Sequence, residues 1–325
     1  MIKRNYCTLF DSNYALKGIA MLRSLAEHSV DLQVYVLCMD DLTESLLAGL
    51  RLPYVTCIKL VEVETKEILT AKNDRSVAEY CWTLSSCIPW HVMHRHPEID
   101  FITYIDADLL FYSSVEPIYA EIADASVAII EHRFTPRFRH LKVNGRFCVE
   151  WVSFRRDQEG LECLRRWREQ CIEWCYYKLE DTRMGDQKYL DEWPRLYRGV
   201  HIIQHLGAGV APWNFDQYAI VADEQSTTTI NGSPLIFYHF HQFQLHDDGS
   251  FFRLSSAYTE LHREPELVYS AYEAALKESL KLARAVQPGF AGGLKRGSKR
   301  ARQWSLATLW GRLRNACGSL LRGGI

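Results

Sequence analysis

Two glycine-rich phosphate-binding motifs are missing from this chain of 325 residues. Neither the G-x-G-x-x-G fingerprint of dinucleotide-binding folds nor the G-x-x-x-x-G-K-[ST] motif of P-loop proteins occurs. No C-x-x-C pair occurs either, which argues against a zinc ribbon, and the ten cysteines are not spaced like a compact disulfide framework. We therefore expect reduced thiols packed in the core of a cytosolic protein.

Long apolar runs and a strong excess of one charge are also absent. No window reaches the roughly 18 uninterrupted apolar residues of a membrane span, and the first residues show no apolar core of a secretory signal. A formal net charge of −2 argues against a nucleic-acid partner for the whole chain. The charge is uneven, because residues 291–325 hold eight Lys or Arg and no acid.

Strand-like and helical patterns alternate over about the first 130 residues. Strands are predicted at 6–10, 32–39, 55–62, 99–105 and 127–131, and helices at 15–27, 43–50 and 76–93. This alternation predicts an α/β fold with a mostly parallel sheet that helices cover on both faces. Ligands of such sheets bind beyond the carboxyl ends of the strands, where Asp11, Asp40 and the pair Asp106/Asp108 are expected.

The pair Asp106 and Asp108 ends an apolar run that begins at Phe101. Alternate residues of a strand point to the same face, so both carboxylates are expected to converge on one hard cation. Mg²⁺ and Mn²⁺ prefer such oxygen ligands and often bridge the phosphates of a nucleotide. The alternative is a strand end with two solvated aspartates.

Taken in order, five motifs resemble the nucleotide-sugar glycosyltransferases of the GT-A fold, specifically family 8 and its relatives that build bacterial cell-surface glycans. They are Asp-x-x-Tyr after the first strand, Asp-x-Asp, Gly-Asp-Gln-x-x-Leu, Gly-x-x-Pro-Trp-Asn and a strand that ends in histidine. The resemblance covers about residues 5–245. It implies a GT-A domain at 1–285, with a nucleotide-binding half (about 1–130), a donor-sugar and acceptor half (about 131–250) and a helical extension (251–285).

In that family, the two acids of Asp-x-Asp and one histidine bind a divalent metal, usually Mn²⁺, that holds the donor diphosphate. The resemblance implies that Asp106, Asp108 and His239 bind Mn²⁺ or Mg²⁺ here. His241 and His205 remain alternatives for the metal-binding histidine. For each of the three, the alternative to metal binding is a polar side chain packed near a strand end.

The resemblance also implies which residues contact the donor, a UDP-sugar. Asp186 and Gln187 match the family pair beside the anomeric carbon, where an oxygen stabilises an oxocarbenium-like transition state. An alternative for Asp186 is to cap a helix that begins at Gln187. Nucleotide contacts are expected from Thr8, Asp11, Tyr14, Lys72, Arg75, Asp106 and Ala107, and a solvated charge or a cap is the alternative for the polar residues at 8–14, 72 and 75.

One departure from the family pattern lies at 147–150. Many members carry Phe-Asn-x-Gly in this strand, whereas this chain has Cys148 and Glu150 at the positions of Asn and Gly. The departure puts the donor or acceptor contacts of this strand in doubt. Its consequence is either an altered substrate choice or a loss of activity.

The basic end, residues 286–325, is expected to form an amphipathic tail. On a helix, Leu306, Leu309, Trp310 and Leu313 would share one face, a pattern typical of an interfacial helix drawn to anionic lipid. The prediction is a cytoplasmic protein bound peripherally to the inner face of the membrane. A helix packed on its own domain and a disordered arm are the alternatives.

The resemblance implies a metal-dependent, retaining glycosyltransferase that acts on a cell-surface glycan or a lipid-linked saccharide. Two other readings remain open. One is a nucleotidyltransferase, although residues 10–16 lack the phosphate loop that it would need. The other is a degenerate protein that binds glycans or membranes without catalysis.

Overall fold

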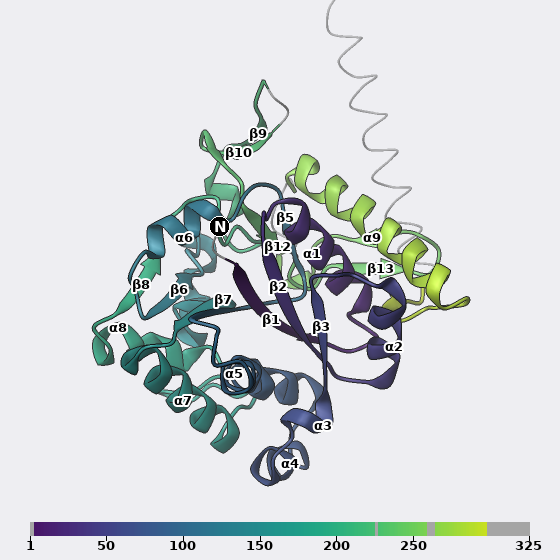
Figure 1. Ribbon diagram of the computed structural model, residues 1–325. Helices are drawn as coiled ribbons and strands as arrows, with labels where there is room; N and C mark the ends of the chain where they lie inside the picture. The colour runs from purple at the N-terminus through teal and green to yellow at the C-terminus, as the bar shows by residue number, and fades with distance from the viewer. Residues whose placement is uncertain (1–2, 225–226, 259–263, 298–325) are drawn as a thin grey trace, which may run out of the picture.

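The computed structural model describes residues 3–224, 227–258 and 264–297. Its centre is a seven-stranded sheet with helices on both faces (Figure 1). In spatial order the strands are β3 (Val55–Lys59), β2 (Leu32–Cys38), β1 (Arg4–Phe10), β4 (Phe101–Ile105), β7 (Phe147–Arg155), β6 (Val127–Glu131) and β8 (Val200–Ile203).

Most neighbours in this sheet run parallel. Only β7 runs antiparallel, against β4 on one side and β6 on the other. Parallel strands that are covered on both faces need apolar side chains on both. In β2, Val34 and Val36 pack into one core, whereas Tyr35 and Leu37 pack into the other. The predicted α/β fold class is confirmed.

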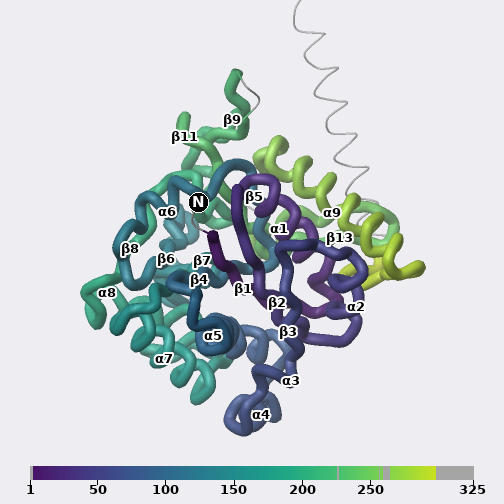
Figure 2. The backbone as a smooth tube through the Cα atoms, viewed as in Figure 1, coloured from purple at the N-terminus to yellow at the C-terminus, as the bar shows by residue number. Residues whose placement is uncertain are grey.

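Two helical layers enclose the sheet. Helices α5 and α7 pack together on one face, and α1, α2 and α9 cover the other (Figures 1 and 2). The helices are α1 (Ala15–Glu27), α2 (Asp41–Leu50), α3 (Leu60–Val63), α4 (Lys66–Lys72), α5 (Val77–Arg95), α6 (Glu116–Ile122), α7 (Gln158–Glu173), α8 (Trp193–Leu196) and α9 (Glu266–Val286).

Most of the predicted boundaries lie within two residues of the observed ones, and the end of one strand differs by more. The strand predicted at 55–62 ends at Lys59, because the Glu62 carboxylate accepts the Lys59 backbone N–H at 2.8 Å and starts helix α3. The helix predicted at 76–93 is observed as α5, which runs from Val77 to Arg95 with Pro89 inside it.

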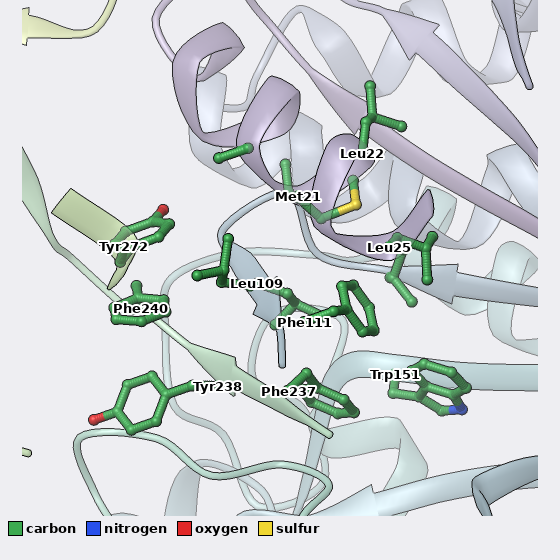
Figure 3. Close-up of a cluster of buried hydrophobic side chains, with 14 of the residues drawn as sticks. Met21, Leu22, Leu25, Leu109, Phe111, Trp151, Phe237, Tyr238, Phe240 and Tyr272 are labelled. Atoms are coloured by element: carbon green, nitrogen blue, oxygen red, sulfur yellow. The ribbon is translucent and has the colours of Figure 1, made fainter. Parts of the chain in front are cut away.

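A two-stranded ribbon lies between the sheet and α9. Strand β5 (Leu109–Phe111) pairs antiparallel with β12 (Phe237–His239). Aromatic rings surround the ribbon (Figure 3): Trp151 stacks on Phe237 with ring centroids 5.6 Å apart, and Phe240 stacks on Tyr272 at 3.7 Å. Buried aromatic pairs of this kind add to the stability of a core, so the ribbon is firmly held.

The short elements complete the described chain. They are η1 (Pro136–Asn144), η2 (Lys188–Glu192), η3 (Phe215–Gln217), η4 (Ser256–Tyr258), β9 (Ile220–Ala222), β10 (Thr228–Ile230), β11 (Ser233–Pro234), β13 (Gln244–His246), β14 (Phe251–Phe252) and β15 (Leu294–Lys295). Among the described residues, no helix has the length and apolar character to cross a membrane.

The segment after α9 returns to the body of the protein. Within the stretch 286–325 that was expected to form the tail, Leu294–Lys295 pairs in parallel with β13. The rest of the expected amphipathic tail, residues 298–325, lies outside the described residues.

Candidate metal and donor site

The two aspartates of the acidic pair lie in the turn between β4 and β5. The expected reason for their convergence is therefore wrong, because β4 ends at Ile105, before either aspartate. The backbone N–H of Asp106 donates to the Glu150 carbonyl at 3.2 Å and so ties the turn to β7. Ala107, between the two aspartates, is buried. A tight turn, rather than strand alternation, brings the carboxylates together.

His239, at the end of β12, faces both aspartates. Its Nε2 lies 3.1 Å from Asp108 Oδ1 and 4.0 Å from Asp106 Oδ2. One ligand atom from each of the three residues lies within 4.8 Å of the others. Two carboxylates and an imidazole this close fit a divalent cation such as Mn²⁺ or Mg²⁺.

The other two candidate histidines are engaged elsewhere. His241 Nδ1 lies 2.9 Å from the Tyr258 hydroxyl. His205 Nδ1 accepts the backbone N–H of Gly207 at 3.1 Å, and the His205 backbone binds Glu121. The geometry therefore favours His239 over both alternatives.

Burial and neighbouring charges strongly shift the pKa values of Asp106, Asp108 and His239. Burial raises the pKa of Asp106 to about 7, although the nearby imidazole of His239 opposes the shift. Burial acts in the same direction on Asp108, but His239 and Lys17 overcome it and hold that pKa well below its usual range. Burial also opposes a charge on His239, yet Asp108 raises its pKa well above the ordinary value.

Lys17 on α1 brings a further positive charge, which the sequence analysis missed. Its Nζ lies 3.5 Å from Asp108 Oδ2 and 4.3 Å from the centre of the Tyr14 ring. The Tyr14 side chain is exposed, which leaves its ring open to a ligand. Lys17 follows Tyr14 at helical spacing i, i+3, and that spacing was the signal that could have identified it.

The other residues expected in the first loop have local roles. The Asp11 carboxylate accepts the backbone N–H groups of Asn13 and Tyr14 at 3.0 and 3.1 Å, which shapes the start of α1. Thr8 is fully buried, and among the described residues its hydroxyl has no hydrogen-bond partner.

Lys72 and Arg75 are already bound by protein groups. Lys72 Nζ lies 2.6 Å from a Glu64 carboxylate oxygen. The Arg75 guanidinium donates to the carbonyls of Cys171 and Ile172 at 2.7 and 2.6 Å, at the end of α7. Neither cationic group is brought to the aspartates in this structure, and their role in phosphate binding stays a prediction.

The Asp-Gln pair lies just before the short helix η2. The Asp186 carboxylate is buried and accepts the Ser85 hydroxyl at 2.6 Å, so it does not cap that helix. Burial raises its pKa to about 6. Its charge also contributes to the raised pKa of Asp106, which places the two carboxylates in one electrostatic environment. The Gln187 side chain donates to the Asn144 carbonyl at 2.9 Å.

The Pro-Trp-Asn loop forms a wall of the site. The Trp213 ring packs edge-on against His239, with centroids 5.3 Å apart. The Asn214 amide accepts the Ala211 N–H and donates to the carbonyls of Gly209 and His132, all within 2.9 Å. This motif therefore holds the imidazole in place.

The segment after α9 also reaches the site, which the sequence analysis did not foresee. Gly292 and Gly293 pack so closely on the Ser12 and Asn13 carbonyls that a side chain there would collide. Lys295 follows, exposed, and its charge adds to the burial that lowers the pKa of Lys17. Lys17 therefore lies beside Asp108, and Lys295 lies near enough to Lys17 to affect its pKa.

Comparison with known proteins places the chain among uncharacterized relatives. It is 34% identical to the uncharacterized protein YfnD of Bacillus subtilis (strain 168) over 292 residues, which cover 89% of this chain and 94% of YfnD. This chain belongs to the YfnD family. It is also 28% identical to the uncharacterized protein YfnF of the same organism, over 88% of this chain and 96% of YfnF. No family model matches the sequence.

Solved structures show the fold. The galactosyltransferase LgtC, in complex with donor and acceptor sugar analogs, matches 92% of this chain and 99% of its own, with a TM-score of 0.50 and 16% identity. The glycosyltransferase GlyE of Streptococcus pneumoniae TIGR4 matches 92% of this chain and 66% of its own, with a TM-score of 0.52 and 15% identity. The YfnD-family chain therefore has the fold of GT-A glycosyltransferases, as expected.

Proposed function

We propose that this protein is a metal-dependent glycosyltransferase that moves a sugar from a UDP-sugar to a saccharide acceptor. The observation that carries the proposal is the cluster of Asp106, Asp108 and His239, whose ligand atoms lie within 4.8 Å of one another in a GT-A-type fold. A Mn²⁺ or Mg²⁺ ion held there supplies the Lewis acid that neutralises charge on the leaving diphosphate.

The chain's own residues would bind the donor around this cluster. Lys17 places an ammonium group beside Asp108, and Lys295 adds a positive charge near Lys17; both would attract the diphosphate. The exposed ring of Tyr14 offers a surface on which the uracil can stack. These groups would orient the donor before the acceptor arrives.

Asp186 and Gln187 are proposed to lie beside the anomeric carbon of the donor sugar. A carboxylate or amide oxygen there stabilises positive charge as the glycosidic bond breaks. We propose retention of configuration, in which the acceptor hydroxyl attacks from the face that the diphosphate leaves. The departing phosphate oxygen then takes the hydroxyl proton, so no side chain is needed as a base.

The acceptor is proposed to be a cell-surface glycan or a lipid-linked saccharide. The support is compositional: residues 298–325, outside the described residues, hold Lys and Arg but no acid. Such a segment is attracted to anionic lipid, which would keep the enzyme near a lipid-linked acceptor.

The direct test incubates the purified protein with a panel of UDP-sugars and Mn²⁺ and follows the products. A transferase should release UDP and free sugar slowly without an acceptor, and faster with one. Release of pyrophosphate from UTP and a sugar phosphate would instead show a nucleotidyltransferase. Absence of turnover with every donor would contradict the proposal.

A further inference from the structure

Glu150 is a carboxylate in the middle of an apolar strand. It belongs to β7 and is fully buried between Val149 and Trp151. Among the described residues, its Oε1 has no hydrogen-bond partner, whereas its Oε2 lies 2.7 Å from His239 Nδ1. A buried carboxylate is costly unless it is paired, so this contact needs a reason.

The backbone fixes Glu150 next to the acidic turn. The Glu150 carbonyl accepts the Asp106 N–H, and β7 shifts its register against β6 between Ile129 and Ile130. Gly209 leaves room for the carboxylate, because a Cβ at that position would lie 2.8 Å from Glu150 Oε1. Gly209 also has a φ of +70°, which other residues rarely adopt.

The contact determines which nitrogen of His239 is free. With the Glu150 carboxylate oxygen as the acceptor, Nδ1 is the donor and carries the hydrogen. The other nitrogen, Nε2, faces Asp108 and Asp106. In metal sites, a carboxylate behind a histidine orients the ring in this way and makes it a stronger ligand.

We propose that Glu150 is a positioning residue that holds His239 with Nδ1 protonated and Nε2 directed to a divalent cation between Asp106 and Asp108. The inference rests on the proposed metal-dependent function and deepens it. The departure from the family pattern at 150 then supports metal binding and does not signal lost activity.

A competing arrangement uses the same residues. Cys148, Glu150 and His239 also place ligand atoms within 4.8 Å of one another. An ion held there would use Glu150 as a direct ligand. The Cys148 sulfur is a soft ligand, whereas Mn²⁺ and Mg²⁺ prefer oxygen ligands. We therefore favour the aspartate side of the imidazole.

The experiment measures Mn²⁺ affinity of the full-length protein from the electron paramagnetic resonance signal of free Mn²⁺. We expect Glu150→Ala to weaken binding 10- to 100-fold, as is typical when such a supporting carboxylate is lost. Glu150→Gln keeps an acceptor for the Nδ1–H of His239 and should lose less Mn²⁺ affinity than Glu150→Ala. Asp108→Asn should lose the most. Glu131→Gln, at the end of β6 and paired with Arg146, is the matched control and should bind as the wild type does.

Three outcomes would overturn the inference. One is a folded Glu150→Ala protein that binds Mn²⁺ with wild-type affinity. Another is Glu150→Gln losing as much affinity as Asp108→Asn, which would make Glu150 a direct ligand. The third is a Cys148→Ser protein that loses the site. Should Glu150→Ala fail to fold, Glu150→Gln, which keeps the size of the side chain, provides the second route; wild-type affinity of that variant would also count against the inference.

The same titration separates this inference from the proposed function. A wild-type protein that takes up no Mn²⁺, with or without UDP, contradicts both. If the wild type binds Mn²⁺ and the Glu150→Ala variant binds it equally well, only the role of Glu150 is contradicted.

Discussion

His239 and Asp108 come from distant parts of the chain, yet their side chains lie 3.1 Å apart. The backbone enforces this contact, because the N–H of Phe240 donates to the Asp108 carbonyl at 2.9 Å. The histidine therefore reaches the acidic turn through strand pairing between β5 and β12. A site that is built into a paired ribbon is held rigidly, as a metal centre requires.

Loss of a metal ligand should abolish donor turnover. We expect Asp108→Asn to lower Mn²⁺-dependent release of sugar from a UDP-sugar at least 100-fold, because the neutral amide is a weaker ligand and leaves less charge for the cation. Asp124→Asn, in the loop after α6, is the control and should keep full activity. Turnover of Asp108→Asn near the wild-type rate would remove the acidic pair from the mechanism.

Lys17, beside Asp108, and Lys295, near Lys17, should contribute to UDP affinity. A hydrogen bond to a charged group contributes about 1.5–3 kcal/mol, so Lys17→Ala and Lys295→Ala should each weaken UDP binding about 10-fold or more. Calorimetry in the presence of Mn²⁺ measures this. Lys281→Ala, on the exposed side of α9, should change nothing. If Lys295→Ala also leaves the affinity unchanged, the segment after α9 does not contact the diphosphate.

Asp186 should make the protein's stability depend on pH. Its pKa is raised to about 6, from an ordinary value near 4, so the folded state holds this proton more tightly than the unfolded chain does. Through this group, folding is favoured in acid, and the benefit is lost as pH rises from about 4 to about 6. The full effect corresponds to about 3 kcal/mol.

Asp186→Asn should remove that dependence. Relative to the wild type, the variant should gain free energy of unfolding when the pH is raised from 4.5 to 7, as measured by denaturant titration at both values. An identical difference between the two proteins at both pH values would show that Asp186 titrates normally.

The basic tail should bind anionic membranes. We expect reversal of three charges, Lys299→Glu with Arg300→Glu and Arg302→Glu in the full chain, to weaken sedimentation with phosphatidylserine vesicles more than 10-fold. Each basic residue near such a surface contributes about 1 kcal/mol. Donor hydrolysis in solution should be unchanged. Equal sedimentation of both proteins, or equal binding to neutral vesicles, would argue against an electrostatic anchor.

Much of the fold is readable in the sequence because its signals are local. The helix predicted at 15–27 and the strand predicted at 127–131 coincide with α1 and β6, since apolar spacing alone marks both. The strand at 55–62 was overextended, because the reach of the Glu62 carboxylate back to the Lys59 N–H is a side-chain detail that hydrophobicity does not show.

The site was only partly readable, because its contacts cross between strands. The sequence placed Asp106, Asp108 and His239 together by resemblance, and the structure brings them together. The sequence did not reveal that Glu150 contacts His239. This contact depends on the position of β7 next to β4 and on the register shift between β7 and β6. A charged residue inside the run from Phe147 to Val152 was nevertheless a signal, since buried carboxylates are rare without a partner.

The most direct measurement is a crystal of the protein with Mn²⁺ and UDP, examined for anomalous scattering at the manganese edge. The account predicts one strong peak within bonding distance of Asp106, Asp108 and His239 Nε2, with the diphosphate of UDP on its open side. A peak at another place, or UDP bound with no manganese between these three residues, would contradict it.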